Sequence, residues 1–366
     1  MRVLQLIDSL EAGGAERMAV NYANGLANRI AFSALAVTRK QGILKEQLEK
    51  AVSYTFLERK RTVDFKAVSR LKRFVEDNSI DIIHAHGTSY FIAIMLKIAY
   101  PKIKIVWHDH HGGRSTQKGY KNAVLKMASR FFDTVMVVNQ ELKAWAERNL
   151  AVAKVIYLPN FAVRDKVEEK QTTLKGTDGK RIVCLSNLRY PKNHALLLEA
   201  FRDSGLHKKE WSLHLIGKDA HDDYSSHLKR FINDNRLDDS IFIYDSCSDI
   251  SNVLEQGTIG VLASVFEGFP VTLLEYGMAG LAVVSTNVGY CGEIIQNEKT
   301  GLSFTPFTPS DVEMLTAQLK RMADDEQLRK SVSEALKTTI RESYSEEIVM
   351  NALILQYQNI LNAKQK

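Results

Sequence analysis

The stretch VLQLIDSLEAGGAERMAVNYANGLANRIAFSALAV, from Val3 to Val37, decides the fold class of this chain. It begins with an apolar run, Val3–Ile7, and passes through a glycine-containing turn into an amphipathic stretch, Ala15–Asn28. It ends in a second apolar run, Ala31–Val37. A strand, a helix and a strand in this order form a βαβ unit, in which the two strands are parallel.

The same alternation of apolar runs and amphipathic stretches continues along the chain in two sets. The segment Val163–Lys180 separates the sets; it is rich in charge, Thr and Gly and lacks apolar periodicity, so it predicts an interdomain connection. We therefore expect two α/β domains in tandem, with a ligand in the cleft between them. The remaining predicted strands are Ser53–Phe56, Ile80–His84, Ile103–Trp107, Thr134–Val138, Lys154–Tyr157, Ile182–Leu185, Ser212–Ile216, Ile241–Tyr244, Ile259–Leu262, Ala282–Ser285 and Leu302–Phe304.

The composition is that of a soluble globular protein, with 45% hydrophobic and 25% charged residues in 366. The net charge of +6 fits an anionic ligand or an acidic membrane surface, and no nucleic-acid-binding motif accompanies it. The three cysteines lack the spacing of a disulfide framework or a zinc ribbon. The run MRVLQLIDSL is too short for a signal peptide, so we expect a cytoplasmic protein, with peripheral binding to the inner face of the membrane as a further hypothesis.

Two glycines, Gly13 and Gly14, follow the first predicted strand and precede a helix. Glycines let the backbone approach a ligand closely, and a helix N-terminus offers free N–H groups to an anion. The alternative is a plain strand-to-helix turn. The pattern is not GxGxxG, which argues against a dinucleotide cofactor.

Histidines gather in DIIHAHG (Asp81–Gly87) and WHDHHG (Trp107–Gly112), each directly after a predicted strand. Zinc or manganese is one interpretation, but the HExxH arrangement and a second carboxylate cluster are both missing, so we expect no metal. A second interpretation is hydrogen bonding to a polar substrate, with His108 or His110 better placed. The third, histidines that are satisfied at strand ends, applies best to His84, His111 and His86.

The stretch LSNLRYPKNHALLLEAF, Leu185–Phe201, places Arg189 and Lys192 in a strand-to-helix turn, with Asn193 as a helix cap. Two cations at a helix entrance predict a phosphate-binding corner, and two solvated surface cations are the alternative. Gly217, at the end of a later strand, marks either another turn at the ligand site or a simple turn.

The stretch FEGFPVTLLEYGMAG, Phe266–Gly280, carries two carboxylates eight residues apart. Glu267 falls in a loop, Pro270 suits a first helical turn, and Glu275 falls inside a helix predicted from about Val271 to Met278. A carboxylate can accept hydrogen bonds from two vicinal hydroxyls, and the backbone N–H groups between the two carboxylates can bind a diphosphate. The alternative is a helix-terminal charge and a solvent-facing Glu275. The residues between the carboxylates that we expect at a donor are Gly268, Phe269, Pro270, Val271 and Thr272.

Seven motifs occur in one order along the chain, and together they resemble the retaining glycosyltransferases with two Rossmann-like domains, the GT-B architecture of family four. The resemblance covers nearly the full length. It implies an acceptor domain over residues 1–165 and a nucleotide-sugar domain over 180–345, facing across a cleft, with a final helix over 346–366 packing back on the first. The motifs are GGAE after the first strand, DIIHAHG, His108-Asp109, Leu158–Asn160, Lys192 in PKNH, Glu267-x7-Glu275 and Gly289–Glu293.

The resemblance also implies roles for the site residues. Glu275 would hold the ribose hydroxyls of a nucleotide-sugar donor, and Glu267 would contact the transferred sugar. Lys192, with a neighbouring arginine, would stabilise the departing diphosphate without a metal or another cofactor. His108 would lie near the reacting centre, and Gly14 would belong to a loop that closes on the donor.

One departure from the family pattern concerns this arginine. Ser186-Asn187 stands where many members have Gly-Arg, and Arg189 follows two positions later. Arg189 is therefore the candidate for the second phosphate-binding cation.

The sequence defines the residues of the donor site better than it defines the chemical identity of the donor or of the acceptor. We expect a UDP-sugar in preference to other donors, and a saccharide or lipid-linked saccharide acceptor of cell-surface polysaccharide synthesis. The segment Gly119–Phe132 mixes apolar and basic residues, which fits either an anionic membrane surface or a core-packed helix. Two alternatives share the architecture: a sugar-nucleotide 2-epimerase and a non-catalytic nucleotide-sugar-binding protein.

Overall fold

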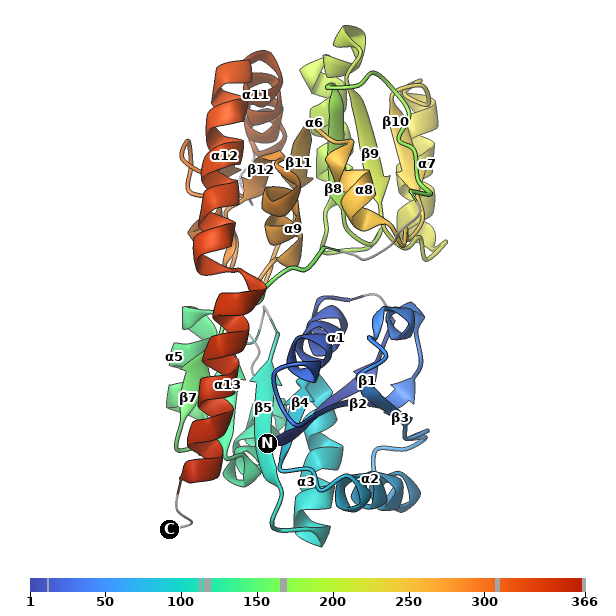
Figure 1. The fold of residues 1–366 in the computed structure, drawn as a ribbon. Coiled ribbons are helices and arrows are strands. Elements are labelled where there is room, and N and C mark those ends of the chain that lie inside the picture. The colour runs from blue at the N-terminus through green and yellow to red at the C-terminus, as the bar shows by residue number, and fades with distance from the viewer. Residues whose placement is uncertain (12, 112–113, 115–119, 165–169, 307–309, 364–366) are drawn as a thin grey trace. The chain divides into compact units, whose positions relative to one another are not determined.

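The chain forms two compact units, each built on its own parallel sheet (Figure 1). The first unit comprises Met1–Phe161 and Glu346–Lys366, and the second comprises Ala162–Ser345. The computed structural model describes residues 1–11, 13–111, 114, 120–164, 170–306 and 310–363. The predicted α/β class, with two parallel-sheet domains, is confirmed.

The first unit contains a seven-stranded parallel sheet in the order β3-β2-β1-β4-β5-β6-β7. Its strands are β1 (Arg2–Ser9), β2 (Phe32–Lys40), β3 (Ser53–Phe56), β4 (Ile82–His86), β5 (Lys104–Asp109), β6 (Thr134–Val137) and β7 (Val155–Tyr157). Its helices are α1 (Gly14–Ala27), α2 (Phe65–Asp77), α3 (Tyr90–Ala99), α4 (Tyr120–Ala128), α5 (Gln140–Asn149) and α13 (Glu346–Asn362), with 3-10 turns at Ile43–Gln47, Gly87–Ser89 and Ser129–Phe131.

The second unit contains a six-stranded parallel sheet in the order β10-β9-β8-β11-β12-β13. Its strands are β8 (Arg181–Leu185), β9 (Ser212–Ile216), β10 (Ile241–Tyr244), β11 (Ile259–Leu262), β12 (Ala282–Thr286) and β13 (Leu302–Phe304). Its helices are α6 (His194–Ser204), α7 (Asp223–Asp234), α8 (Ile250–Glu255), α9 (Val271–Ala279), α10 (Cys291–Ile294), α11 (Asp311–Asp324) and α12 (Glu326–Ser343), with a 3-10 turn at Leu206–Lys209.

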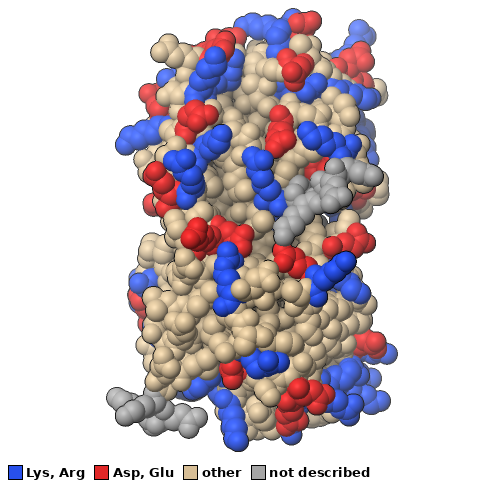
Figure 2. Space-filling model, viewed as in Figure 1, with Lys and Arg blue, Asp and Glu red and all other residues tan. Residues whose placement is uncertain are grey.

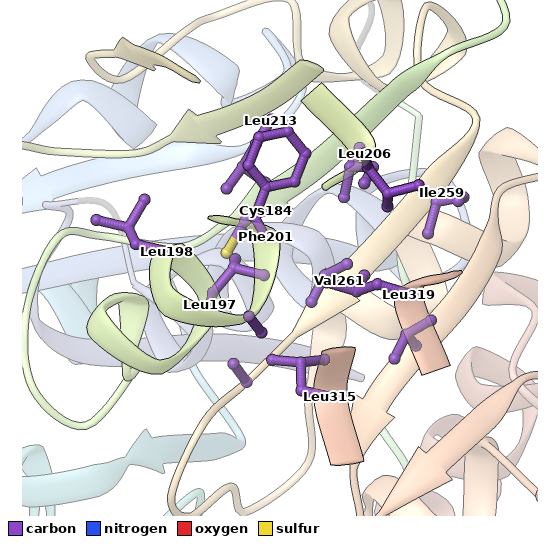
Figure 3. Packing of buried hydrophobic residues seen from close by; sticks show 14 of the residues in the cluster. Cys184, Leu197, Leu198, Phe201, Leu206, Leu213, Ile259, Val261, Leu315 and Leu319 are labelled. Atoms are coloured by element: carbon purple, nitrogen blue, oxygen red, sulfur yellow. The ribbon is translucent and has the colours of Figure 1, made fainter. Parts of the chain in front are cut away.

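The apolar runs become strands because helices bury the sheets. In the second unit, Leu197 and Phe201 of α6 pack with Leu213 of β9 and with Leu315 and Leu319 of α11 (Figure 3). Each of these side chains is fully buried. Burial of one large apolar side chain stabilises the unit by about 1.5–3 kcal/mol. Residues more than a hundred positions apart therefore share one core.

Both sheets reverse their strand order beside the first strand of the unit. β1 lies between β2 and β4, and β8 lies between β9 and β11. In open parallel sheets, ligands bind outside the carboxyl ends of the strands at such a reversal. A ligand is therefore expected at the loops that follow β1 and β4 and at those that follow β8 and β11.

One segment differs from the sequence-based expectation. The residues after position 169 do not form a free connection, because the N–H groups of Gln171 and Thr172 donate to Asp249 at 2.8 Å and Leu174 is buried. The interdomain prediction over residues 165–169 lies outside the described residues. In α13, Val349 and Met350 are buried in the first unit, whereas Ile348 and Leu355 are exposed.

The surface carries both signs of charge. On the face drawn in Figure 2, Lys and Arg side chains are interspersed with Asp and Glu over both units. Within the described residues, no helix has both the length and the apolar composition needed to cross a bilayer.

Candidate active site

The turns after β8 and β9 are fastened to each other at the reversal point of the second sheet. The side chain of Asn187 accepts the N–H of Lys218 at 3.0 Å, and the N–H of Leu188 donates to the carbonyl of Lys218 at 3.0 Å. A Cβ on Gly217 would lie 2.4 Å from the carbonyl oxygen of Ser186. Gly217 is thus required for the close approach of two backbone segments.

Lys192 and Glu267 meet at this point, although 75 residues separate them. Lys192 Nζ lies 2.6 Å from Glu267 Oε1, and the hydroxyl of Ser264 donates to the same oxygen at 2.7 Å. The N–H of Val265 donates to the carbonyl of Pro191 at 2.9 Å, which holds the two loops together. The structure therefore joins the predicted cation and the predicted carboxylate in one ion pair.

Arg189 lies in the same turn but on its surface. The Lys192 N–H donates to the Arg189 carbonyl at 2.9 Å, and the Arg189 side chain is exposed. The predicted capping of α6 by the Asn193 side chain is wrong. Asn193 has a left-handed backbone (φ 57°) and makes no capping side-chain hydrogen bond, and the His194 N–H donates instead to the hydroxyl of Tyr224 at 2.8 Å. A residue whose side chain caps a helix normally has an extended backbone conformation.

Helix α9 begins within one residue of its predicted start. Pro270 occupies the N-cap position, one residue before the first turn that was predicted for it, and the Leu273 N–H donates to the Pro270 carbonyl at 3.1 Å. Gly268, Phe269, Pro270 and Val271 are buried, and Thr272 is half-buried. Glu275, in the second turn of α9, is half-buried and has a polar partner.

Tyr276, which no feature of the sequence singles out, connects α9 to the sheet. Its buried hydroxyl accepts the Leu185 N–H at 2.8 Å and donates to the Val261 carbonyl at 3.1 Å, so it links α9 to both strands at the reversal point. A Cβ on Gly260 of β11 would lie 2.6 Å from the Tyr276 ring. A glycine within a predicted strand was the available signal for this close contact.

The loop at Glu267 also rests on the stretch after β12. Gly289 has a left-handed backbone (φ 52°), and a Cβ there would lie 1.7 Å from the Glu267 carbonyl oxygen. The Tyr290 ring stacks on Phe269, with the ring centroids 4.8 Å apart. This packing fixes the direction of the Glu267 loop.

In the first unit, the glycine turn follows β1. Gly13 is the N-cap of α1 with an extended backbone, and α1 begins at Gly14, whose Cβ position has no neighbour within 4 Å among the described residues. The N-terminus of α1 is thus open around Gly14. Residue 12 lies outside the described residues.

His108 belongs to a cluster of histidines at the ends of β4 and β5. His84 Nε2 and His108 Nδ1 lie 3.1 Å apart, and His86 Nδ1 and His110 Nε2 lie 3.0 Å apart. Burial lowers the pKa of His84 and of His110 to about 3, and it lowers the pKa of His86 and His108 well below the usual value. All four imidazoles are therefore neutral near pH 7.

Three of these histidines, His84, His86 and His108, could offer nitrogens to a metal ion, because those atoms lie within 4.8 Å of one another. Their geometry is that of a hydrogen-bonded array. The facing nitrogens of His84 and His108 already share a hydrogen bond, and the two rings are within 10° of parallel. An ion would also have to replace the His84–His108 hydrogen bond.

Comparisons with protein families fit this arrangement of two sites. Residues 12–165 match the model described as Glycosyltransferase Family 4, and residues 165–339 match Glycosyl transferases group 1. The chain belongs to the group 1 glycosyltransferases. The second match includes Lys192, Glu267 and Glu275, and the first includes His108.

Individual relatives of this glycosyltransferase are distant in sequence. The capsular polysaccharide biosynthesis glycosyltransferase CapH of Staphylococcus aureus is 21% identical, over 88% of this chain and 98% of CapH. The N,N'-diacetylbacillosaminyl-diphospho-undecaprenol alpha-1,3-N-acetylgalactosaminyltransferase of Campylobacter jejuni is 23% identical, over 80% of each chain. The crystal structure of Anabaena HepE with UDP and glucose superposes with a TM-score of 0.81 at 15% identity, over 98% of this chain and all of HepE. These likenesses establish the GT-B fold.

Proposed function

We propose that this glycosyltransferase moves a sugar from a nucleotide-diphosphate donor to a saccharide or lipid-linked saccharide acceptor, with retention of configuration and without a metal. The observation that carries the proposal is the Lys192–Glu267 ion pair at the reversal point of the second sheet. UDP is the favoured nucleotide because the related structures of HepE, GtfA and TarM contain it. The CapH and Campylobacter relatives favour a role in cell-surface polysaccharide synthesis.

The ion pair offers groups of both kinds that such a donor needs. The Lys192 ammonium has three N–H donors and uses one on Glu267, so two can serve phosphate oxygens. Lys192 and Ser264 both donate to Oε1 of Glu267. Among the described residues, Oε2 therefore remains for a sugar hydroxyl.

In the proposed reaction, the bond between the anomeric carbon and the diphosphate breaks, and a bond to the acceptor oxygen forms on the same face. The leaving phosphate takes the proton of the acceptor hydroxyl. Lys192 balances the charge that develops on the diphosphate, Arg189 is the second cation, and the N–H groups near Val271 add a helix N-terminus. Glu267 orients the transferred sugar, and Glu275 holds the ribose.

In this proposal Lys192, Arg189 and the helix N-terminus balance the charge of the leaving diphosphate, so no metal ion is required. Transfer should persist in EDTA, whereas loss of transfer that manganese restores would assign the metal role to the histidine cluster of the first unit. The measurement is nucleotide release with and without chelator.

Membrane attachment is proposed at the α4 segment. Val124, Met127 and Phe131 are exposed there beside the exposed cations Lys126 and Arg130, the mixture that suits an anionic lipid surface. Residue 119 of the predicted segment lies outside the described residues. Co-sedimentation with liposomes of anionic lipid at low salt tests this; a protein that stays in the supernatant refutes it.

The function itself is tested by a thermal-shift screen of UDP, GDP and their sugars, followed by a transfer assay with the stabilising donor. A ligand at 100 times its Kd stabilises the folded state by about 2.7 kcal/mol. Stabilisation by one nucleotide identifies the base, and absence of any shift refutes the proposal. Conversion of UDP-N-acetylglucosamine alone into an epimer would identify a 2-epimerase, and binding without turnover would identify a non-catalytic protein.

A further inference from the structure

The histidine cluster of the first unit is connected through two residues from opposite ends of the chain. Gln5 of β1 and Tyr357 of α13 are fully buried beside it. Gln5 Oε1 lies 2.8 Å from His86 Nε2, and Gln5 Nε2 donates to the Tyr357 hydroxyl at 3.3 Å. The same hydroxyl lies 2.6 Å from His84 Nδ1.

These contacts form one unbranched relay with two arms. One arm runs from Gln5 through His86 to His110, and the other runs from Gln5 through Tyr357 and His84 to His108. Within the described residues, the two end atoms, His108 Nε2 and His110 Nδ1, are buried and have no hydrogen-bond partner. A buried polar atom without a partner is destabilising, so both ends require a ligand atom or a water molecule.

The two ends face the same side. The ring planes of the hydrogen-bonded pairs differ by 10° for His84 and His108 and by 22° for His86 and His110. The pairs stack on each other, with centroids 4.5 Å apart for His84 and His86 and 4.1 Å apart for His108 and His110. Because the bonded nitrogens of His108 and His110 face the β4 histidines, their free nitrogens both lie on the far side. Because the ring centroids of His108 and His110 are only 4.1 Å apart, we infer that one oxygen atom contacts both nitrogens.

Neutral imidazoles give the relay a single direction. Each neutral ring donates at one nitrogen and accepts at the other. With the Gln5 amide as placed, His86 donates to Gln5 and His110 donates to His86, which leaves His110 Nδ1 as an acceptor. In the other arm, Gln5 donates to Tyr357, Tyr357 to His84 and His84 to His108, which leaves His108 Nε2 as a donor. Reversing the amide reverses every bond, and the ends still differ.

We propose that Gln5 and Tyr357 are positioning residues that make His108 and His110 one donor and one acceptor, a pair that selects a single hydroxyl group. A hydroxyl both donates and accepts, whereas a phosphate or carboxylate would meet one unmatched acceptor, and an ammonium group one unmatched donor. Identification of the hydroxyl as one of a sugar substrate rests on the proposed function, and a water molecule takes its place otherwise. The low pKa values of the four histidines agree with this arrangement.

The direct test is nitrogen NMR of the histidine rings in the intact, 15N-labelled protein at pH 7, without any substrate. All four histidines should carry the same tautomer, protonated at Nε2 with Gln5 as placed. Opposite tautomers in the two arms, or a protonated imidazolium among the four, would overturn the proposal.

A pair of tyrosine variants tests the role of Tyr357. Tyr357→Phe removes the link between the arms, so His84 and His108 should become a tautomer mixture that no longer follows the tautomer of His86 and His110. Tyr22→Phe is the matched control: the Tyr22 ring packs on the same histidines, and its buried hydroxyl has no partner among the described residues. An unchanged His108 tautomer in Tyr357→Phe refutes the relay.

Kinetics separates this inference from the function. Tyr357→Phe should lower kcat/KM for transfer about five- to tenfold, the loss expected when one hydrogen bond no longer orients a substrate contact. Uniform tautomers without transfer from any nucleotide sugar would refute the proposed function and retain the relay. Active transfer with mixed tautomers in the unmodified protein would refute the relay alone.

Discussion

Replacing Lys192 with methionine tests the central contact of the proposed donor site. The variant keeps most of the side-chain volume and removes the ammonium group that lies 2.6 Å from Glu267 Oε1. In the proposed mechanism this charge stabilises the leaving diphosphate. Loss of one such preorganised donor lowers kcat by about 10²–10³-fold, or about 2.7–4 kcal/mol.

The effect on folding should be smaller. The gross attraction of two charges at this separation is about 6 kcal/mol at an effective dielectric constant of about 20. The side chains are 21% and 12% exposed, so solvent offsets part of it, and Glu267 keeps its hydrogen bond from Ser264. We expect the free energy of unfolding to fall by about 1–3 kcal/mol.

The assay is nucleotide release with the donor that stabilises the protein in the thermal-shift screen, together with urea unfolding. Lys209→Met is the matched control, because Lys209 forms a 2.8 Å ion pair with Asp324 and lies just before β9, at the amino end of that strand. This exposed pair should contribute less than about 1 kcal/mol, and its loss should leave kcat unchanged. A Lys192→Met enzyme with unchanged kcat refutes the assignment of Lys192 to the leaving group.

Four further outcomes follow from the same geometry. Arg189→Ala should lower kcat about 10- to 100-fold if its guanidinium forms a charge-assisted hydrogen bond to phosphate, and an unchanged rate would assign the second cation elsewhere. A left-handed residue other than glycine costs about 1–2 kcal/mol, and Gly289→Ala should lower the free energy of unfolding by more than this, because its Cβ meets the Glu267 carbonyl. The control is Gly205→Ala, at a left-handed position with open space around it. Equal losses in the two variants would contradict the clash. Tyr276→Phe should destabilise by about 1–3 kcal/mol in urea unfolding, since the Leu185 N–H and the Val261 carbonyl lose their partner; a loss near zero would contradict it. The folded-state pKa values of His84 and His110, about 3, lie below the unfolded value near 6.5, so their contribution to stability is fully present above pH 6.5. As the pH decreases toward 3, the free energy of unfolding should fall by about 1.4 kcal/mol per pH unit for each histidine. Unfolding free energies that stay level from pH 6 to pH 5 would refute the burial of these two histidines as neutral rings.

The contacts of the candidate site were only partly predictable from the sequence. The turn chemistry placed Lys192 after one strand and Glu267 after another, but the sequence did not indicate that they would pair. Asn193 has the right residue type for a cap, and its left-handed backbone prevents this role. Tyr276 read as one more apolar position of a helix, although its hydroxyl joins two strands.

The helices, the strands and the class of fold were predictable from local patterns in the sequence. Apolar runs at strand length and amphipathic stretches at helical period are local properties, so they predicted two parallel α/β sheets and the start of α9 within one residue. The ordered motifs also sufficed to indicate the glycosyltransferase family.

The contacts between distant side chains were not predictable in this way, because they depend on how the elements pack. Lys192 and Glu267 meet because β11 inserts next to β8, and Gln5 meets Tyr357, 352 positions away, because α13 returns to the first unit. Local periodicity carries no information on strand order or on the docking of a terminal helix. Those depend on the burial of whole faces against one another, and the hydrogen-bond partners of a buried polar group are fixed only when that packing is complete.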